Sequence, residues 1–495
     1  MDIGKQRPSN AARAEPRPAA EITYPEPPQQ LRRFNIRSAL AFFGPGAIVA
    51  SATVGSGETI FPARGAAIFG YSIIWMLIVA IIFKGALMYV SNRYMTITGE
   101  HPLTRLAHSI PGPRCWLPIV LGLLAVGSLP FWIGGLSLAI GDYLSFLAGG
   151  SGRLWATGFL LGCGLLAWVG GYRFVEKAQL FIVGLLLIAI LVAVFWARPD
   201  WISFLYGFVP QPLGYADWLA DKYPAVASRP LWVETVTYLG ALGGGLQDYF
   251  GYTGMLREKR WGLLGRDDIL RLGEEFETLP RGQHLPLPES EHEVAKARIW
   301  SRAPRSDVML SVTAVAVAAI AFAVNGADLL HGQQLVPSED NLLRYQAQFL
   351  GVVFPALSYL YYVAIFFAFF GTVFGLGEVY SSATHEAVGA VFPRVRRWGL
   401  NVTRRWAYPY MFGFGLLLLW VTSDPISLVT ISAIVGGVFG MGIYLLAILY
   451  SERQVLPKPY RLKGFGWGLA LVSGIVLTGF GVIAILQQLG IVSGS

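Results

Sequence analysis

An acidic side chain interrupts the first long apolar stretch of the chain, where the sequence reads VGSGETIFP. Three small residues, Gly55, Ser56 and Gly57, precede Glu58 in this stretch. Glycine permits backbone conformations that leave helical geometry, and a serine hydroxyl can cap the N–H groups that a break releases. A carboxylate beside freed backbone groups is suited to binding a cation or to capping the helix that follows. The pattern predicts an interrupted helix that carries an acid at its break.

A second acid follows glycines in the same way, in the stretch YLGALGGGLQDYFGYTG. Gly244 and Gly245 belong to a run of three glycines here, and Gln247, Asp248 and Tyr249 come next. A helix cap is worth about 1 kcal/mol, whereas an acid at membrane depth costs roughly 2.5–3.5 kcal/mol, and a serine would cap at lower cost. We therefore expect both acids to bind a ligand, with capping as the simpler alternative.

Composition places both stretches in a membrane. Of the 495 residues, 54% are hydrophobic and 14% are charged, against about a quarter charged in soluble proteins. Apolar runs of about 20 residues recur, which is enough to cross a bilayer. The two cysteines, Cys115 and Cys163, form neither a disulfide framework nor a metal cluster. The chain has no metalloprotease, P-loop or serine-hydrolase motif, so a membrane enzyme or a non-transporting sensor is the least favoured class.

The apolar runs predict an all-α polytopic membrane protein of about eleven transmembrane helices. The expected spans are about 38–66 (interrupted), 70–92, 116–146, 153–171, 175–197, 233–256 (interrupted), 307–327, 350–374, 405–422, 426–450 and 465–488. The first and sixth spans would each begin a half of five helices. Paired broken helices in corresponding positions indicate a transporter with a 5+5 inverted repeat and a binding site at the bilayer midplane.

Lysine and arginine are distributed unequally between the connecting segments, which predicts the orientation. With the N-terminus in the cytoplasm, the basic clusters of 257–305, 394–405 and 453–463 all lie inside. This asymmetry accounts for the net charge of +8 without a nucleic-acid partner. We expect a multi-pass protein of the plasma (inner) membrane. The expected parts are a disordered cytosolic tail (1–37), a first repeat (38–197), an external loop (198–232), a second repeat (233–450) with a cytosolic loop (257–305), and a final helix with the C-terminus (451–495).

Several segments resemble the Nramp family of divalent-metal transporters. The segment GPGAIVASATVGSGETIFPARGAAIFGYSIIW is similar to the first helix of that family, where Gly-Pro-Gly is followed at the same spacing by Asp-Pro-Gly-Asn. The similarity continues in GYRFVEKAQLFIVGLLLIAI, ARPDW and FAVNGA, and covers most of residues 38–450. The resemblance implies a LeuT-type fold of eleven or twelve helices and transport driven by an ion gradient.

The residues that the family uses for its chemistry are mostly replaced. The family's metal-binding Asp, Pro and Asn of the first helix align with Gly55, Ser56 and Glu58. Its Met-Pro-His of the sixth helix falls on Gln247, Asp248 and Tyr249. Without a thioether or histidine, only oxygen ligands remain, and these suit a hard dication such as Mg²⁺ or Mn²⁺. The predicted metal ligands are Glu58, Asp248 and Gln247. The predicted substrate site is completed by Gly55, Ser56, Gly57, Gly244, Gly245 and Tyr249.

Two further charged residues bear on the substrate. Lys84 lies deep in the second predicted span, so we expect an internal partner, namely an acid of the site. If Lys84 pairs with Glu58 or Asp248, the site is nearly neutral, and an amino acid or another small organic solute becomes the alternative cargo. Glu378, near the inner end of the eighth span, is a second candidate for coupling or charge compensation. We expect no cofactor, a small cation or solute as the only ligand besides lipid, and a monomer as the simplest state.

Overall fold

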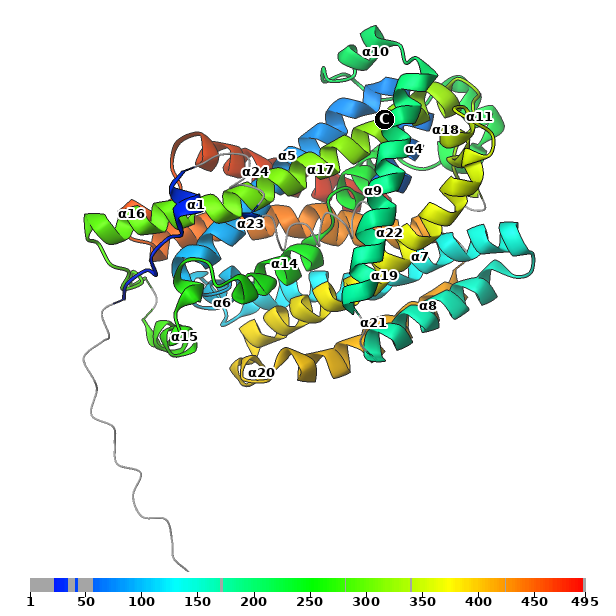
Figure 1. Cartoon of the computed structure of the whole chain (residues 1–495). Helices are drawn as coiled ribbons and strands as arrows, with labels where there is room; N and C mark the ends of the chain where they lie inside the picture. Colours follow the sequence, from blue (N-terminus) through cyan, green and yellow to red (C-terminus); the bar gives the residue numbers. More distant parts are fainter. Residues whose placement is uncertain are drawn as a thin grey trace, which may run out of the picture.

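A computed structural model describes residues 22–33, 41–42, 57–169, 172–280, 282–338, 341–422 and 424–492. Long helices dominate this part of the chain and form one bundle, in which α9 crosses the others steeply (Figure 1). They are α4 (Gly57–Phe69), α5 (Ile74–Thr98), α7 (Trp116–Ala148), α8 (Gly152–Val169), α9 (Tyr172–Ala197), α13 (Leu231–Ala241), α14 (Leu246–Lys259), α17 (Arg302–Asn325), α19 (Leu357–Val391), α21 (Leu400–Val421), α22 (Pro425–Ile434), α23 (Gly440–Val455) and α24 (Gly464–Gln488).

These helices correspond to the predicted spans. By length and composition, seven helical stretches in the described residues are apolar enough to cross a membrane. The other predicted spans correspond to α9, to α21 and to the interrupted pair α13 and α14. The first predicted span is described only from Gly57, so its break at Gly55 and Ser56 lies outside the described residues.

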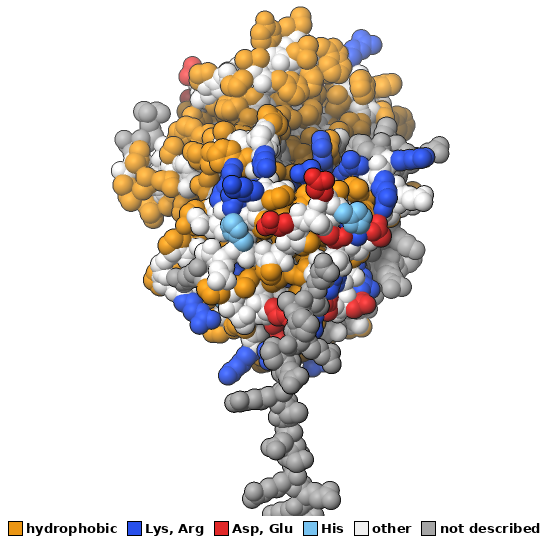
Figure 2. All heavy atoms as spheres, turned by 90° about the vertical axis from the view of Figure 1, so that its left-hand side faces the viewer, with side chains coloured by type: hydrophobic (Ala, Val, Ile, Leu, Met, Phe, Trp, Pro, Cys, Tyr) orange, Lys and Arg blue, Asp and Glu red, His pale blue; other side chains and the backbone are white. Residues whose placement is uncertain are grey.

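Shorter helices cover the two ends of the bundle. One end carries α10 (Trp201–Tyr206), α11 (Asp217–Lys222), α12 (Pro224–Ala227) and α18 (Ala347–Gly351). The other end carries α1 (Gln29–Arg32), α6 (Pro102–Ser109), α15 (Ile269–Thr278), α16 (Glu291–Trp300) and α20 (Pro393–Arg396). We call the second one the charged end, because Lys, Arg, Asp and Glu side chains gather there below a largely hydrophobic surface (Figure 2).

The charged end has a hydrophobic core of its own, separate from the core of the bundle. Side chains of residues 261–303 form it together with Val455, Leu456 and Tyr460. No such core is apparent from the residues of segment 257–305 taken alone. The reason is that the loop supplies only part of the core, and distant segments supply the rest.

The described residues of the N-terminal segment, 22–33, correct an expectation. Residues 1–37 were predicted to be a disordered tail, but Tyr24 and Leu31 are buried in the core of the charged end. The backbone N–H of Tyr24 donates to Glu293 at 2.6 Å, and its hydroxyl donates to the carbonyl of Ile97 at 2.8 Å. The indole of Trp300 donates to the carbonyl of Pro25 at 2.8 Å. These bonds hold residues 22–33 against α5 and α16.

Segments 198–232 and 257–305 lie at opposite ends of the bundle (Figure 1). With Cys115 and Cys163 replaced by alanine, cysteines at the exposed positions Asp221 and Glu275 should differ in labelling of intact cells by an impermeant thiol reagent. We expect Asp221→Cys to react from outside and Glu275→Cys only after permeabilisation, because the basic charge lies on the side of Glu275. The reverse pattern would overturn the predicted orientation.

Candidate functional site

The sixth predicted span is broken at its glycines. Helix α13 ends at Ala241 and α14 begins at Leu246, so residues 242–245 leave helical geometry in the interior of the bundle. Gly243 and Gly244 have φ of +73° and +79°, which L-residues with a side chain rarely adopt. The predicted break of this helix is therefore confirmed. It exposes carbonyl groups at the end of α13 and N–H groups at the start of α14.

Lys84 enters this break from α5. Its Nζ donates to the carbonyls of Gly240 at 2.8 Å, Leu242 at 2.6 Å and Gly244 at 2.7 Å. An ammonium has three N–H donors, so all of them are used. The side chain is only 1% exposed. The break therefore forms a cage of three carbonyl oxygens around a cation that the chain itself supplies.

The predicted ion pair of Lys84 with an acid is wrong. Among the described residues, no carboxylate oxygen lies within 4.0 Å of its Nζ. The carbonyls at the C-terminal end of α13 carry partial negative charge and satisfy the whole ammonium at once. The carboxylates instead face the N–H groups on the other side of the break.

Glu58 reaches the break from the first turn of α4. Its Oε1 accepts a hydrogen bond from the backbone N–H of Gly243 at 2.7 Å, whereas its Oε2 is buried without a hydrogen-bond partner among the described residues. Helices α4 and α13 are in direct contact here. Gly57 lies so close to Ala241 that a Cβ added to Gly57 would be 2.3 Å from the carbonyl oxygen of Ala241. One carboxylate oxygen of Glu58 thus remains available beside the carbonyl cage.

Asp248 lies at the start of α14 and is 4% exposed. Its Oδ2 accepts from the backbone N–H of Gly245 at 2.7 Å, so it caps its own helix. Both acids act on the Lys84 ammonium through space, although neither pairs with it. With all three side chains ionised, the site carries a net charge of −1.

The other predicted site residues are divided between two faces of α14. Tyr249 is 4% exposed, and its hydroxyl oxygen lies 3.8 Å from the position of a Cβ on Gly243, beside the cage. Gln247 is fully buried, but its Oε1 lies 3.2 Å from the position of a Cβ on Gly436, which belongs to η5 (Val435–Phe439). The amide of Gln247 therefore lies between η5 and Gly245 of the break, since its Nε2 is 2.7 Å from the position of a Cβ on Gly245. Gly55 and Ser56 lie outside the described residues.

The site contains no cluster typical of a transition metal. Among the described residues, no group of three or more His, Cys, Asp or Glu side chains could hold a metal ion. The oxygen atoms at the break are backbone carbonyls, two carboxylates and the hydroxyl of Tyr249. Such a set fits hard cations and does not favour soft ones.

Known proteins share both sequence and fold with this chain. Residues 46–237 match the family described as natural resistance-associated macrophage protein-like (Nramp). The natural resistance-associated macrophage protein 2 of Homo sapiens is 28% identical over 148 residues, which is 26% of this chain and 25% of that protein. The Mus musculus protein of the same name is 27% identical over 144 residues. Residues 46–237 resemble the Nramp family in sequence.

Solved structures extend the likeness of this Nramp-related chain to the whole bundle. A mutant manganese transporter of Eremococcus coleocola matches with a TM-score of 0.65 and 15% identity, over 91% of this chain and 87% of that one. The same transporter in complex with an aromatic bis-isothiourea substituted compound matches with a TM-score of 0.61 and 14% identity, over the same shares. The fold is the expected LeuT-type arrangement. The sequence matches span only a quarter of the length of the curated relatives.

Glu378 lies apart from the break in the Nramp-related bundle. It forms an ion pair with Arg404 and accepts a hydrogen bond from the hydroxyl of Tyr408 at 3.3 Å, and both partners belong to α21. None of these contacts reaches Lys84 or the carbonyl cage. Its predicted part in coupling or charge compensation stays a prediction.

Sequence reasoning missed several buried acids, among them Glu234 and Asp307. Glu234 in α13 binds Arg64 of α4, with 3.0 Å from Nε and 2.9 Å from Nη2 to Oε1, and both side chains are 1% exposed. Asp307 in α17 accepts from the hydroxyl of Tyr252 and is also fully buried. Glu234 stands in the apolar stretch LWVETV, which is the signal that could have marked it, whereas Asp307 directly follows the polar stretch SRAPRS and carries no such signal.

Proposed function

We propose that this Nramp-related chain is a secondary transporter that moves a hard divalent cation, Mg²⁺ or Mn²⁺, by alternating access around the break of the sixth helix. The carbonyl cage around Lys84 Nζ carries the proposal: it is a cation-binding site that a tethered cation now fills. The likeness to a protein named as a manganese transporter supports the same class of cargo. We assign no enzymatic activity and no resident cofactor.

The charges at the break favour a dication over the ammonium. Glu58 and Asp248 leave the site at −1 with Lys84 present and would leave it neutral with a dication in place of the ammonium. Glu58 has one oxygen without a partner, so it can bind a cation while the other oxygen keeps its bond to Gly243. Cargo binding in this scheme displaces Lys84 from the carbonyls. Gln247 would have to turn away from η5 to become a ligand.

Neutralising the two acids tests this function. In proteoliposomes, Glu58→Gln and Asp248→Asn should each abolish uptake of Mg²⁺ and Mn²⁺, because the amides keep the capping bonds and lose the charge. Glu378→Gln is the matched control and should retain uptake, since its described contacts do not reach the break. Normal dication uptake by both site variants would contradict the proposal.

An amino acid or another small organic solute is the second candidate, and the full set of bonds to Lys84 favours it. A built-in cation needs no exchange with solution, and a half-helix N-terminus at the break offers N–H groups to the anionic group of a solute. Uptake assays with a panel of amino acids and dications, with and without a pH gradient, separate the two candidates. Wild-type protein that accumulates an amino acid and no dication would establish the second.

We infer that the protein acts in the plasma (inner) membrane with its N-terminus and charged end in the cytoplasm. The basic charge at that end supports this orientation. A monomer satisfies the proposal, because every residue of the described site comes from one chain. Nucleic acid has no part in it.

A further inference from the structure

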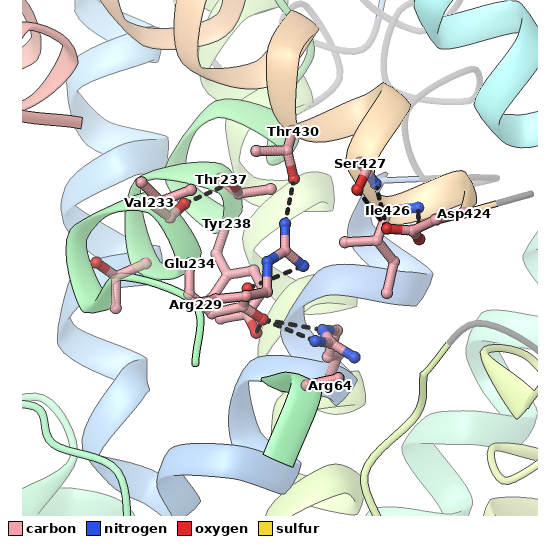
Figure 3. Close-up of polar contacts among 12 residues, drawn as sticks. Arg64, Arg229, Val233, Glu234, Thr237, Tyr238, Asp424, Ile426, Ser427 and Thr430 are labelled. Atoms are coloured by element: carbon pink, nitrogen blue, oxygen red, sulfur yellow. Dashed lines mark hydrogen bonds and ion pairs between the residues drawn. The ribbon is translucent and has the colours of Figure 1, made fainter. Parts of the chain in front are cut away.

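The Arg64–Glu234 pair belongs to a larger buried cluster that includes Arg229 and Tyr238 (Figure 3). The hydroxyl of Tyr238 donates to Oε1 of Glu234 at 2.5 Å, and Nη1 of Arg229 lies 3.1 Å from Oε2. Arg64 also donates to the carbonyl of Pro337. We call these four residues the outer cluster, because they lie toward the end of the bundle that is predicted to be external.

The outer cluster separates the carbonyl cage from an open cavity. Arg64 follows Glu58 by six residues in α4, a helical rise of about 9 Å. On its other side lies a cavity of about 490 Å³, which Arg64 and Arg229 line together with Lys222, Tyr223, Asp424 and Ser427. The direct path between this cavity and the cage therefore runs past Arg64 and Arg229.

Arg229 differs from the other members of the outer cluster. Its side chain is 20% exposed, whereas those of Arg64 and Glu234 are 1% exposed. It precedes α13, and its Nη2 donates to the hydroxyl of Thr430 at 2.9 Å, across to α22 (Figure 3). Deeper in the bundle α13 and α22 touch through their backbones, since a Cβ on Gly240 would lie 2.1 Å from the carbonyl oxygen of Ala433. Arg229 therefore links α13 to α22 at the side of their contact that faces the cavity.

Arg229 also sets the charge of the outer cluster. Arg64 and Glu234 cancel, so Arg229 leaves the three charged side chains at +1. A buried positive charge repels a cation on its route, and the repulsion is larger than in water because the surroundings are less polarisable. Turning Arg229 into the cavity would leave the remaining pair neutral.

We propose that Arg229 is a gating residue that closes the external route to the cage, both by joining α13 to α22 and by repelling cations. Opening then requires that Arg229 leave Thr430 and move into the cavity. The proposal rests on the proposed function, because only a transporter needs this route. It concerns access to the cage and not the identity of the cargo.

A cysteine in α13, deeper in the bundle than Arg229, reports on access from outside. Thr237 is buried and lies one turn before Gly240 on the same face of α13, which packs on α22. In a protein with Cys115→Ala, Cys163→Ala and Thr237→Cys, the labelling rate is measured with a cationic and an anionic methanethiosulfonate of similar size. This assay needs no transport, so its result is independent of whether any dication moves.

Arg229→Gln should raise the labelling rate by the cationic reagent about tenfold, the effect of removing one charge about 10 Å away. Thr430→Val should raise the rates of both reagents alike, because it loosens the bridge and keeps the charge. Lys222→Gln is the matched control: it removes a charge from the cavity wall without touching α22, and its rates should stay near those of the parent.

Two results would contradict the proposal that Arg229 is a gating residue. One is an Arg229→Gln variant that labels no faster than Lys222→Gln. The other is a Thr430→Val variant that labels no faster than its parent. Melting temperature and a single size-exclusion peak check that each variant is folded. If Arg229→Gln does not fold, Thr430→Val alone decides. Faster labelling in a protein that transports no dication would keep the gate and reject the proposed cargo.

Discussion

Lys84→Met should unfold at a much lower temperature than the wild type, and millimolar Mg²⁺ or Mn²⁺ should restore much of the loss. The substitution leaves the carbonyls of Gly240, Leu242 and Gly244 without the donors that now satisfy them. A buried polar group without a partner costs about 1–3 kcal/mol, so three of them cost roughly 3 kcal/mol or more. Thermal unfolding in detergent measures the loss directly.

The rescue by metal follows from the same geometry. Without the ammonium, the charges of Glu58 and Asp248 leave the cage at −2, which favours a dication. A ligand at about 100 times its dissociation constant stabilises the folded state by about 2.7 kcal/mol. Glu58→Gln combined with Lys84→Met is the control and should lose the rescue, because it removes a charged ligand. Destabilisation by Lys84→Met that no dication relieves would argue against metal at this site and favour the organic solute.

Glu234→Gln should be among the most destabilising single substitutions in the chain, at about 3–5 kcal/mol, the range measured when one partner of a buried ion pair is removed. It leaves the guanidinium groups of Arg64 and Arg229 without a counter-charge in the bundle interior. Chemical denaturation in detergent measures the free energy of unfolding.

Two further variants test whether the loss in free energy of unfolding comes from the burial of the unpaired charges. Asp267 forms an ion pair with Arg260, and their side chains are 95% and 58% exposed, respectively. Asp267→Asn breaks this pair and should lower the free energy of unfolding by at most about 1 kcal/mol. The double variant Glu234→Gln with Arg64→Gln should recover part of the loss, because it also removes one of the stranded charges. An effect of Glu234→Gln no larger than that of Asp267→Asn would mean that the outer cluster is not important for stability.

The bundle was predictable because its signals are local. Lengths of apolar sequence located the helices, and the glycines of 243–245 located the break, since both depend on neighbours in the chain. The packing of residues 22–33 was not predictable. Their few apolar side chains, among them Tyr24 and Leu31, bind to a surface built from segments that are far away in sequence.

The sequence indicated which residues form the site better than it indicated which groups they bind. Glu58, Asp248 and Lys84 were identified because each is a charge in apolar sequence. Which group Lys84 binds depends on the register of α5 against α13, which the sequence does not display. Arg64 and Glu234 are 170 residues apart, so no local pattern links them. The first break and its residues Gly55 and Ser56 stay a prediction.

A tethered ammonium has a consequence for the concentration at which cargo binds. Lys84 cannot diffuse away from the cage, so a free cation competes with an occupant whose effective concentration is fixed by the fold and is at least millimolar for short flexible tethers. The apparent affinity for an external cation is weakened by the ratio of this effective concentration to the dissociation constant of the ammonium for the cage. Such a site suits an ion that is present at high concentration. A trace metal would bind only after Lys84 had left the carbonyls of the cage.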